Sequence, residues 1–411
     1  MSWPLKPVSE LCEFAIDCVN KTAPVVDVAT PYKMIRTTNV KGGFIDVLEV
    51  RHVSKDTFEK WTRRSRPRYG DVVLTREAPV GEVGRCTFSD DENIFLGQRL
   101  FHYRPNPDVL DWNYLAYILQ SPEVQGRFHG RSFGATVPHV KVADAESLLI
   151  PCPPLDVQKK LGTVLANYDD LIATNQRRIT LLEDAARRLY REWFVHLRFP
   201  GHESVAVKDG MPDRWSFAPL AGLCEEVRDM VDPTAISPET AYLSMEHMPQ
   251  KSISLSVWES AQKVGSTKLR FQVGDVLFGK IRPYFHKVGL AAIAGITSTD
   301  VIVVRVVDLS ALPLVLMIMS STNFVGHAVT TSNGTKMPRA DWKILRQWPV
   351  LIPDDTVLLQ YQSAVSPLLD QMSTLVFQNR ALARARDLLL PKLMSGQLDV
   401  SRIPLLEETL A

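Results

Sequence analysis

Hydrophobic residues recur every three or four positions along two stretches of the chain, 157–193 and 365–393. This spacing is typical of one face of an α-helix, and the heptad form of the pattern is typical of a coiled coil. The first stretch contains no proline and a single glycine, Gly162. The pattern therefore predicts two long helices. The expected seam residues are Leu161, Val164, Tyr168, Leu171, Asn175, Leu182 and Leu189 in the first helix, and Val365, Leu368, Met372, Leu375, Asn379, Leu382 and Leu389 in the second.

Some residues in both predicted helices do not fit the hydrophobic pattern. Asn175 and Asn379 are of the kind that fixes register in a coiled coil at a cost in stability, and Arg386 is a misfit in the second seam. Pro367 is expected to kink the second helix near its start, or to delay that start to about residue 366. A helix of about 37 residues is roughly 55 Å long and cannot bury such a stripe alone. We expect the two helices to pack antiparallel with a globular domain at each end; the alternative is that each folds back on its own domain.

Short matches in the same order indicate that the chain is an internal duplication. Each match alone is weak, but the offset between the copies drifts by only a few positions. The matches pair Trp3, Leu11 and Cys12 with Trp215, Leu223 and Cys224 (offset 212), residues 69–74 with 273–278 (204), Gly134 and Pro138 with Gly334 and Pro338 (200), and residues 149–151 and Gln158 with 351–353 and Gln360 (202).

The part of each half that precedes the helix is rich in β-branched and aromatic residues, with short apolar runs such as 70–75, 274–278 and 299–307 between turn residues. This composition predicts mixed α/β domains with many strands. The expected fold class is therefore α+β: two similar mixed α/β domains, two long antiparallel coiled-coil helices and an internal pseudo-twofold repeat. The expected divisions are the first domain at 1–152, the central helix at 153–200, the second domain at 201–352, and the C-terminal helix and tail at 353–411.

Composition narrows the class of protein. The 411 residues carry 47 Lys and Arg against 46 Asp and Glu, which excludes a uniformly basic nucleic-acid coat, and 45% hydrophobic residues are typical of a globular chain. The longest apolar run, 311–319, is far shorter than the roughly 20 residues of a membrane span. The first residues lack the apolar stretch of a signal peptide, so we expect a cytoplasmic protein with no membrane contact. Five scattered cysteines indicate neither a disulfide framework nor a metal site.

The motifs of a self-contained enzyme are missing. Neither Gly-x-x-x-x-Gly-Lys nor Gly-x-Gly-x-x-Gly occurs, and the single Pro-Pro, at 153–154, lacks the context of an adenine methyltransferase loop. The single Asp-x-Lys, 341–343, has no obvious carboxylate partner for a metal. We therefore expect no catalytic residue and no metal site in this chain.

Positive charge is concentrated locally. Residues 60–69 hold five cations and two aromatics without an acid, and a comparable stretch runs from 263 to 287. Each half also has two loop segments that are rich in hydrogen-bond donors and contain Gly and Pro. They are 74–81 and 131–141 in the first half, and 278–286 and 331–339 in the second. Turn chemistry explains the Gly and Pro, whereas the charged and polar side chains suit phosphate and base-edge contacts. The predicted DNA-contacting residues are Arg63, Arg64, Arg66, Arg68, Thr75, Arg76, Arg131, Thr136, His139, Lys141, Lys280, Arg282, Tyr284, His286, Asn333, Lys336 and Arg339.

These motifs resemble one known family over essentially the whole chain. Gly-Asp-Val-Val-Leu-Thr-Arg-Glu-Ala-Pro-Val-Gly at 70–81, Gly-Ala-Thr-Val-Pro-His at 134–139, the Ile-Pro-x-Pro-Pro-Leu-x-x-Gln segment at 150–158 and the ending at 388–396 are similar to those of the specificity subunits of type I restriction–modification systems. The second half departs from the pattern, with Gly-Lys-Ile-Arg-Pro at 279–283 and Asp-Asp-Thr at 354–356.

The resemblance implies two target-recognition domains, each reading one half of a split site in double-stranded DNA, spaced by the helices. It also implies partners: two methyltransferase subunits that bring S-adenosylmethionine and methylate adenine, and restriction/translocase subunits that bring ATP and Mg²⁺ and cleave DNA. No cofactor is then expected in this chain. Two alternatives stay open, namely a chain that itself methylates or cuts DNA, and a coiled-coil adaptor that binds only proteins.

Overall fold

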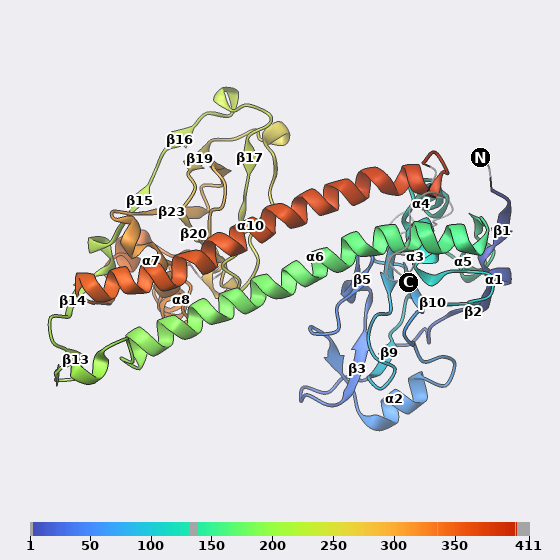
Figure 1. Ribbon diagram of the computed structural model, residues 1–411, viewed down its shortest axis with the longest axis horizontal. Coiled ribbons are helices and arrows are strands. Elements are labelled where there is room, and N and C mark those ends of the chain that lie inside the picture. The colour runs from blue at the N-terminus through green and yellow to red at the C-terminus, as the bar shows by residue number, and fades with distance from the viewer. Residues whose placement is uncertain (1–2, 131–138, 335, 399, 401–411) are drawn as a thin grey trace, which may run out of the picture. The chain divides into compact units, whose positions relative to one another are not determined.

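The computed structural model describes residues 3–130, 139–334, 336–398 and 400 (Figure 1). Its contacts divide the chain into two compact units, each built from a globular part and portions of both long helices. Unit 1 comprises Met1–Leu171 and Leu382–Ala411, and unit 2 comprises Ile172–Ala381.

A four-stranded antiparallel sheet in the order β2-β10-β7-β8 lies at the centre of unit 1, beside a smaller sheet in the order β6-β3-β9 whose strands β3 and β9 are parallel. The strands are β1 Leu5–Pro7, β2 Cys12–Asp17, β3 Tyr32–Ile35, β4 Val40–Lys41, β5 Phe44–Ile45, β6 Arg51–His52, β7 Val72–Arg76, β8 Val80–Arg85, β9 Asn93–Leu96, β10 Leu100–Pro105 and β11 Leu149–Pro151; the shorter helices are α1 Val8–Leu11, α2 Lys55–Trp61, α3 Trp112–Gln120, α4 Pro122–Gly130 and α5 Val142–Glu146.

Unit 2 repeats this sheet in the corresponding order β15-β23-β20-β21, beside a five-stranded sheet in the order β16-β19-β22-β17-β18. In each unit a further strand pair, β1 with β11 and β14 with β24, joins the start of the globular part to the strand before a long helix. The strands are β12 Val207–Lys208, β13 Met211–Pro212, β14 Ser216–Pro219, β15 Cys224–Val227, β16 Met230–Val231, β17 Ala241–Tyr242, β18 Glu259–Ser260, β19 Lys268–Phe271, β20 Val276–Gly279, β21 Val288–Leu290, β22 Gly295–Thr297, β23 Val301–Val306 and β24 Pro349–Ile352; the shorter helices are α7 Leu312–Met319, α8 Thr322–Thr330 and α9 Trp342–Leu345. The predicted α+β class and internal repeat are confirmed.

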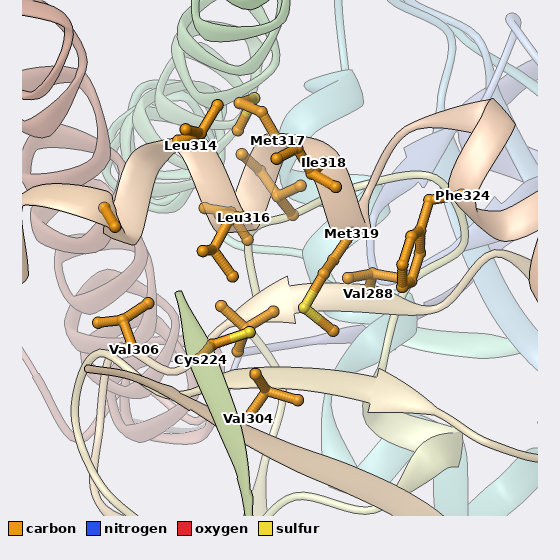
Figure 2. Close-up of a cluster of buried hydrophobic side chains, with 14 of the residues drawn as sticks. Cys224, Val288, Val304, Val306, Leu314, Leu316, Met317, Ile318, Met319 and Phe324 are labelled. Atoms are coloured by element: carbon orange, nitrogen blue, oxygen red, sulfur yellow. The ribbon is translucent and has the colours of Figure 1, made fainter. Parts of the chain in front are cut away.

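The apolar run at 311–319 forms the core helix of unit 2. Residues 313–319 of α7 are all buried, and Figure 2 shows Leu314 and residues 316–319 on the side of the strands that carry Val304, Val288 and Cys224. Among the described residues no single helix is long and apolar enough to cross a membrane. Only the bent pair Leu309–Met319 and Thr322–Thr330 meets that test jointly, on length and composition.

The two predicted long helices are present as α6, Leu155–Tyr190, which continues into a π-helical turn, Arg191–Val195, and α10, Asp355–Met394. In unit 1 the first turns of α6 share a core with the last turns of α10, where Leu161 and Leu393 are both buried. In unit 2 the last turns of α6 meet the first turns of α10, with the rings of Trp193 and Tyr361 centred 5.4 Å apart. The helices are therefore antiparallel within each unit, as predicted.

Both helices also pack on the globular parts. The contacts expected from the alternative, in which each helix folds back on its own domain, therefore occur together with the helix–helix contacts. A Cβ on Gly162 of α6 would stand 2.6 Å from Asp111 Oδ1, at the start of α3. This glycine lets α6 lie directly against the start of α3.

Two expectations for the helices are wrong. α10 begins at Asp355, ahead of Pro367, so the expected delay of its start to about residue 366 is wrong, whereas the expected kink at Pro367 stays a prediction. Packing of this part of α10, where Tyr361 and Val365 are buried, outweighs the lost N–H donor and the steric cost of the proline. Leu171 is 52% exposed and lies outside the seam. On that turn the inward positions belong to Asp169, which is buried, and Ile172, whose carbonyl accepts a 3.3 Å hydrogen bond from Asn379 Nδ2.

The other predicted seam residues are buried or half-buried. The fully buried ones are Leu161, Asn175, Val365, Met372 and Leu375; the half-buried ones are Val164, Tyr168, Leu182, Leu189, Leu368, Asn379, Leu382 and Leu389.

Candidate nucleic-acid interface

The two predicted loop regions of the first half meet at one end of the central sheet of unit 1. Arg76 ends β7, and its Nη1 donates to the carbonyl of Val140 over 3.0 Å, while the Val140 N–H donates back to the carbonyl of Arg76 over 2.9 Å. Glu77 and His139 form an antiparallel bridge beside this pair. Segments more than 60 positions apart in sequence thus form one surface.

The same loop pairing occurs in unit 2. The N–H of Ala340 donates to the carbonyl of Lys280 over 2.9 Å, Ile281 and Arg339 form an antiparallel bridge, and the N–H of Arg282 donates to the carbonyl of Pro338 over 2.7 Å. These pairs stand 200 and 204 positions after their counterparts in unit 1, the offsets of the sequence repeat. The backbone frame of the loops is therefore duplicated.

Three predicted residues of the second half line one cavity of about 360 Å³: Lys280, Asn333 and Arg339. Arg228 and Lys343 add positive charge there, against the carboxylates Glu226 and Asp341. Arg339 is half exposed, and its nearest carboxylate, that of Asp300, lies 3.8 Å away. The cavity presents donors on a surface of net positive charge, which suits phosphate and base acceptors.

The Asp-x-Lys at 341–343 has a structural explanation. The Asp341 carboxylate accepts a 2.9 Å hydrogen bond from the Lys343 N–H and caps α9. Among the described residues no group of three His, Cys, Asp or Glu side chains is arranged to hold a metal ion.

In unit 1 the side chains at the corresponding positions are different. His139 and Lys141 are exposed, whereas Arg76 is largely buried. Thr75 was predicted to contact DNA, and this is wrong: it is fully buried, and its hydroxyl accepts a 2.9 Å hydrogen bond from the N–H of Glu82 in the β7–β8 hairpin. The predicted Arg131 and Thr136 lie outside the described residues.

The arginines of the 60–69 stretch divide into two groups. Arg63 and Arg68 are exposed. Arg64 pairs with Asp17 over 3.0 Å, and Asp17 also lies 3.9 Å from Arg76, so one carboxylate connects this stretch to the loop surface. Arg66 is half-buried, and its Nη2 donates to the carbonyls of residues 90 and 92 over 3.1 Å, which ties the stretch to the loop before β9.

The remaining predicted residues of unit 2 are Arg282, Tyr284 and His286, which lie in the turn at 282–286, and Lys336, which lies in the loop at 331–339. Tyr284 is 51% exposed, and Lys336 is exposed. The Arg282 Nε is buried without a partner among the described residues. His286 is half-buried, and its Nε2 lies 2.8 Å from the carbonyl of Ser320; burial lowers the pKa of this imidazole, which is therefore neutral at pH 7 and donates this bond.

Sequence reasoning missed a buried ion pair at the start of β7 and of β20, the strands that lead to these loops. Asp71 is buried and accepts two hydrogen bonds from Arg104, of 2.9 and 2.8 Å, while Asp275 accepts two of 2.8 Å from Arg305. The repeated Gly-Asp dipeptide was a visible signal, because Gly70 has a φ of 85° that only glycine adopts freely and the aspartate follows it directly. The partner arginine could not be found, because it lies on another strand.

Comparison with known proteins agrees with this geometry. Residues 7–184 match the type I restriction modification DNA specificity domain. The type I restriction enzyme MjaIX specificity subunit of Methanocaldococcus jannaschii is 24% identical over 367 residues, 86% of this chain and 83% of the relative. The EcoDI specificity subunit of Escherichia coli is 24% identical over 329 residues, 72% of each chain.

A solved structure shows the same fold. The type I restriction–modification S subunit from M. genitalium matches with a TM-score of 0.57 over 95% of this chain and 96% of that one, at 14% identity. The matched relatives are named as specificity subunits of type I restriction enzymes. Residues 7–184 of the chain thus match the DNA specificity domain of type I restriction–modification systems, and most of the chain is similar to specificity subunits of such systems.

Proposed function

We propose that the chain reads a two-part site in double-stranded DNA, with each unit reading one half. The observation that carries this proposal is the duplicated loop frame: residues 76–77 pair with 139–140 in unit 1, and residues 280–281 pair with 339–340 in unit 2, on the same sheet order. The backbone is kept while the side chains change, so the two surfaces suit two different short sequences.

In this proposal the cationic and polar groups on these loops make two kinds of contact, to phosphates and to base edges. Lysine and arginine neutralise phosphates and supply affinity that falls with added salt, whereas Asn333 and Arg339 have the forked donors and acceptors that match base edges in the major groove. Joining two readers in one chain makes the second contact intramolecular, so two weak half-sites add up to one tight site.

The chemistry is proposed to reside in partners. Methyltransferase subunits would bring S-adenosylmethionine and flip the target adenine into their own site, at a cost met by binding along the duplex. Restriction/translocase subunits would bring ATP and Mg²⁺. The chain would then direct where both act, in a bipartite site that neither partner selects.

The test is to map methylated adenines in the host genome with the chain, without it, and with Arg339→Gln. Deleting the chain is expected to abolish a two-part motif, and Arg339→Gln is expected to weaken or relax only one half of it. Arg346→Gln, an exposed arginine outside the loop cavity, is the matched control and should leave the motif unchanged. A motif that survives deletion, or two halves that change together in Arg339→Gln, contradicts the proposal.

The two alternatives make distinct predictions for the purified chain. A self-sufficient enzyme would transfer methyl groups from S-adenosylmethionine or cut DNA without partners. A protein-only adaptor would show no salt-dependent affinity for duplex DNA. We expect no turnover and a steep loss of DNA binding with salt.

A further inference from the structure

A second cationic cavity lies in unit 2, apart from the loop cavity at Lys280 and Arg339. It has a volume of about 540 Å³ and lies between the last turns of α6, the turn that carries His286, and the start of α8. Its cationic walls come from Arg187, Arg191 and Lys251. No carboxylate stands among the described residues that line it.

The cations differ in how far they are already neutralised. Arg187 Nη2 donates to the Glu183 carboxylate over 3.2 Å and to the carbonyl of Lys251 over 2.7 Å, so this guanidinium is held in place at the wall. Arg191 and Lys251 are exposed, and neither has an ion-pair partner in the described part of the chain. Two positive charges are therefore available to an incoming ligand, beside a third that is fixed.

Neutral donors lie on the opposite wall. Thr322 and Asn323 of the first turn of α8 line the cavity, and Ser321 caps this helix, its hydroxyl accepting from the N–H of Phe324 over 3.2 Å. The first-turn N–H groups have no partner within the helix. His286 is neutral because burial lowers its pKa, and its Nε2 is engaged with the Ser320 carbonyl. The imidazole thus helps to shape the wall, and the positive charge comes from α6 and Lys251.

We infer that this cavity binds a phosphate group through Arg191, Lys251 and the fixed guanidinium of Arg187. A tetrahedral dianion suits a cavity that is lined by three cationic side chains and, among the described residues, by no carboxylate, although the charge of Arg187 is already paired with Glu183 and Asp184. The phosphate would come from the backbone of bound duplex DNA or from a free phosphate compound. In the first case the inference rests on the proposed function, and it adds a contact that positions the duplex without reading its sequence.

The experiment uses the full-length chain and the double variant Arg191→Gln/Lys251→Gln, with Arg178→Gln as the matched control on the exposed surface of the same helix. Affinity for duplex DNA is measured as a function of salt for a specific and an unrelated sequence. A lost phosphate contact lowers the slope of log affinity against log salt by about 0.9 per contact and weakens both sequences equally. A second arm compares thermal unfolding in inorganic phosphate and in chloride at equal ionic strength, without DNA.

Each outcome has a distinct meaning. A lower salt slope in the double variant, with sequence preference kept and Arg178→Gln unchanged, supports a backbone phosphate. An unchanged slope, with phosphate-specific stabilisation lost only in the double variant, supports a free phosphate ligand. If neither quantity differs between the double variant and the control, the inference is overturned. If the wild-type chain binds no DNA at all, the proposed function fails, and the phosphate arm still decides the cavity.

Discussion

At the scale of single residues, the strand that leads to each loop surface is preceded by a buried carboxylate held by an arginine of the neighbouring strand. Asp71 accepts from both Arg104 and His102, and His102 in turn lies 3.0 Å from the Ser65 hydroxyl. In unit 2 Asp275 keeps the arginine, Arg305, but Val303 stands where unit 1 has the histidine. The buried carboxylate–arginine pair therefore occurs in both units, whereas the histidine occurs at this position in unit 1 alone.

Replacing Asp71 tests this pair. Asp71→Asn leaves Arg104 without its counter-charge in a largely buried setting, and removing one partner of a buried pair costs about 3 kcal/mol. We expect a loss of unfolding free energy of this order, measured by urea denaturation at pH 7. Asp91→Asn, an exposed aspartate of the same unit, removes the same charge and should change stability little.

The pH dependence of the same variant provides a second measurement. Burial by itself would raise the pKa of Asp71, but hydrogen bonds from Arg104 and His102 outweigh it, and the pKa is lowered from 3.8. A carboxylate with a lowered folded-state pKa stabilises the fold above its unfolded-state pKa and loses that contribution as the pH falls through the folded-state value. The difference in unfolding free energy between wild type and Asp71→Asn should therefore be constant above about pH 4 and shrink below it. A difference that grows toward acid pH would contradict this assignment.

At the scale of elements, the helix pair of unit 1 is held by a buried charge network. Asp169 of α6, 1% exposed at its side chain, pairs with Arg386 of α10, accepts a 2.5 Å hydrogen bond from Tyr117 of α3, and lies 3.8 Å from Arg85 of β8. Arg386 was the misfit of the predicted seam. It occupies an inward position because its partner is a buried carboxylate, and mispairing the helices would separate this pair, leaving Arg386 with Asp387 and Asp169 with Arg85. The pair therefore specifies the antiparallel register in this unit.

A double-mutant cycle measures this coupling. Asp169→Asn and Arg386→Gln are each expected to lower the unfolding free energy by about 3 kcal/mol, since each removes one partner of a buried ion pair. The double variant should lose less than the sum of the two, by about 1–3 kcal/mol, because the second change removes a charge whose partner in the pair the first had already removed. Arg384→Gln, on the exposed side of the same turn of α10, should combine additively with Asp169→Asn. Additivity in both cycles would mean that the pair does not set the register.

At the scale of the whole molecule, the features that the sequence predicted are those set by periodicity and repetition. Two long helices, their antiparallel packing and the duplicated sheet follow from patterns that extend over many residues. Thr75, Leu171 and the start of the second helix were misjudged because each depends on local packing: a hydroxyl turned into a hairpin, a helix face on which the buried position belongs to Asp169, and a helix start that packing places ahead of Pro367. The partners of Asp71 and Asp169 could not be predicted, because spatial contacts across 33 and 217 positions leave no local pattern.

The helices are proposed to set the distance between the two half-sites, and matched insertions test this. One heptad after Leu171 in α6 and one after Ala381 in α10 fall at the junctions between the units, so the contacts inside each unit are kept. Seven residues add ~10 Å of helix, which corresponds to about three base pairs of duplex. We expect methylation mapping to show a spacer longer by about three base pairs, with both half-site sequences unchanged.

The rotation of the DNA grooves along the duplex gives the same insertions a second expected result, a change in affinity. Three base pairs turn the duplex by roughly 100°, whereas a heptad returns a helix to within about 20° of its starting direction, so one heptad should weaken binding. Three matched heptads add about nine base pairs, close to one turn of the duplex, and affinity should recover. An insertion in α6 alone shifts its partners on α10 and should lower both stability and methylation. If either half-site sequence changes with helix length, the helices take part in base recognition, and their assignment as a spacer is wrong.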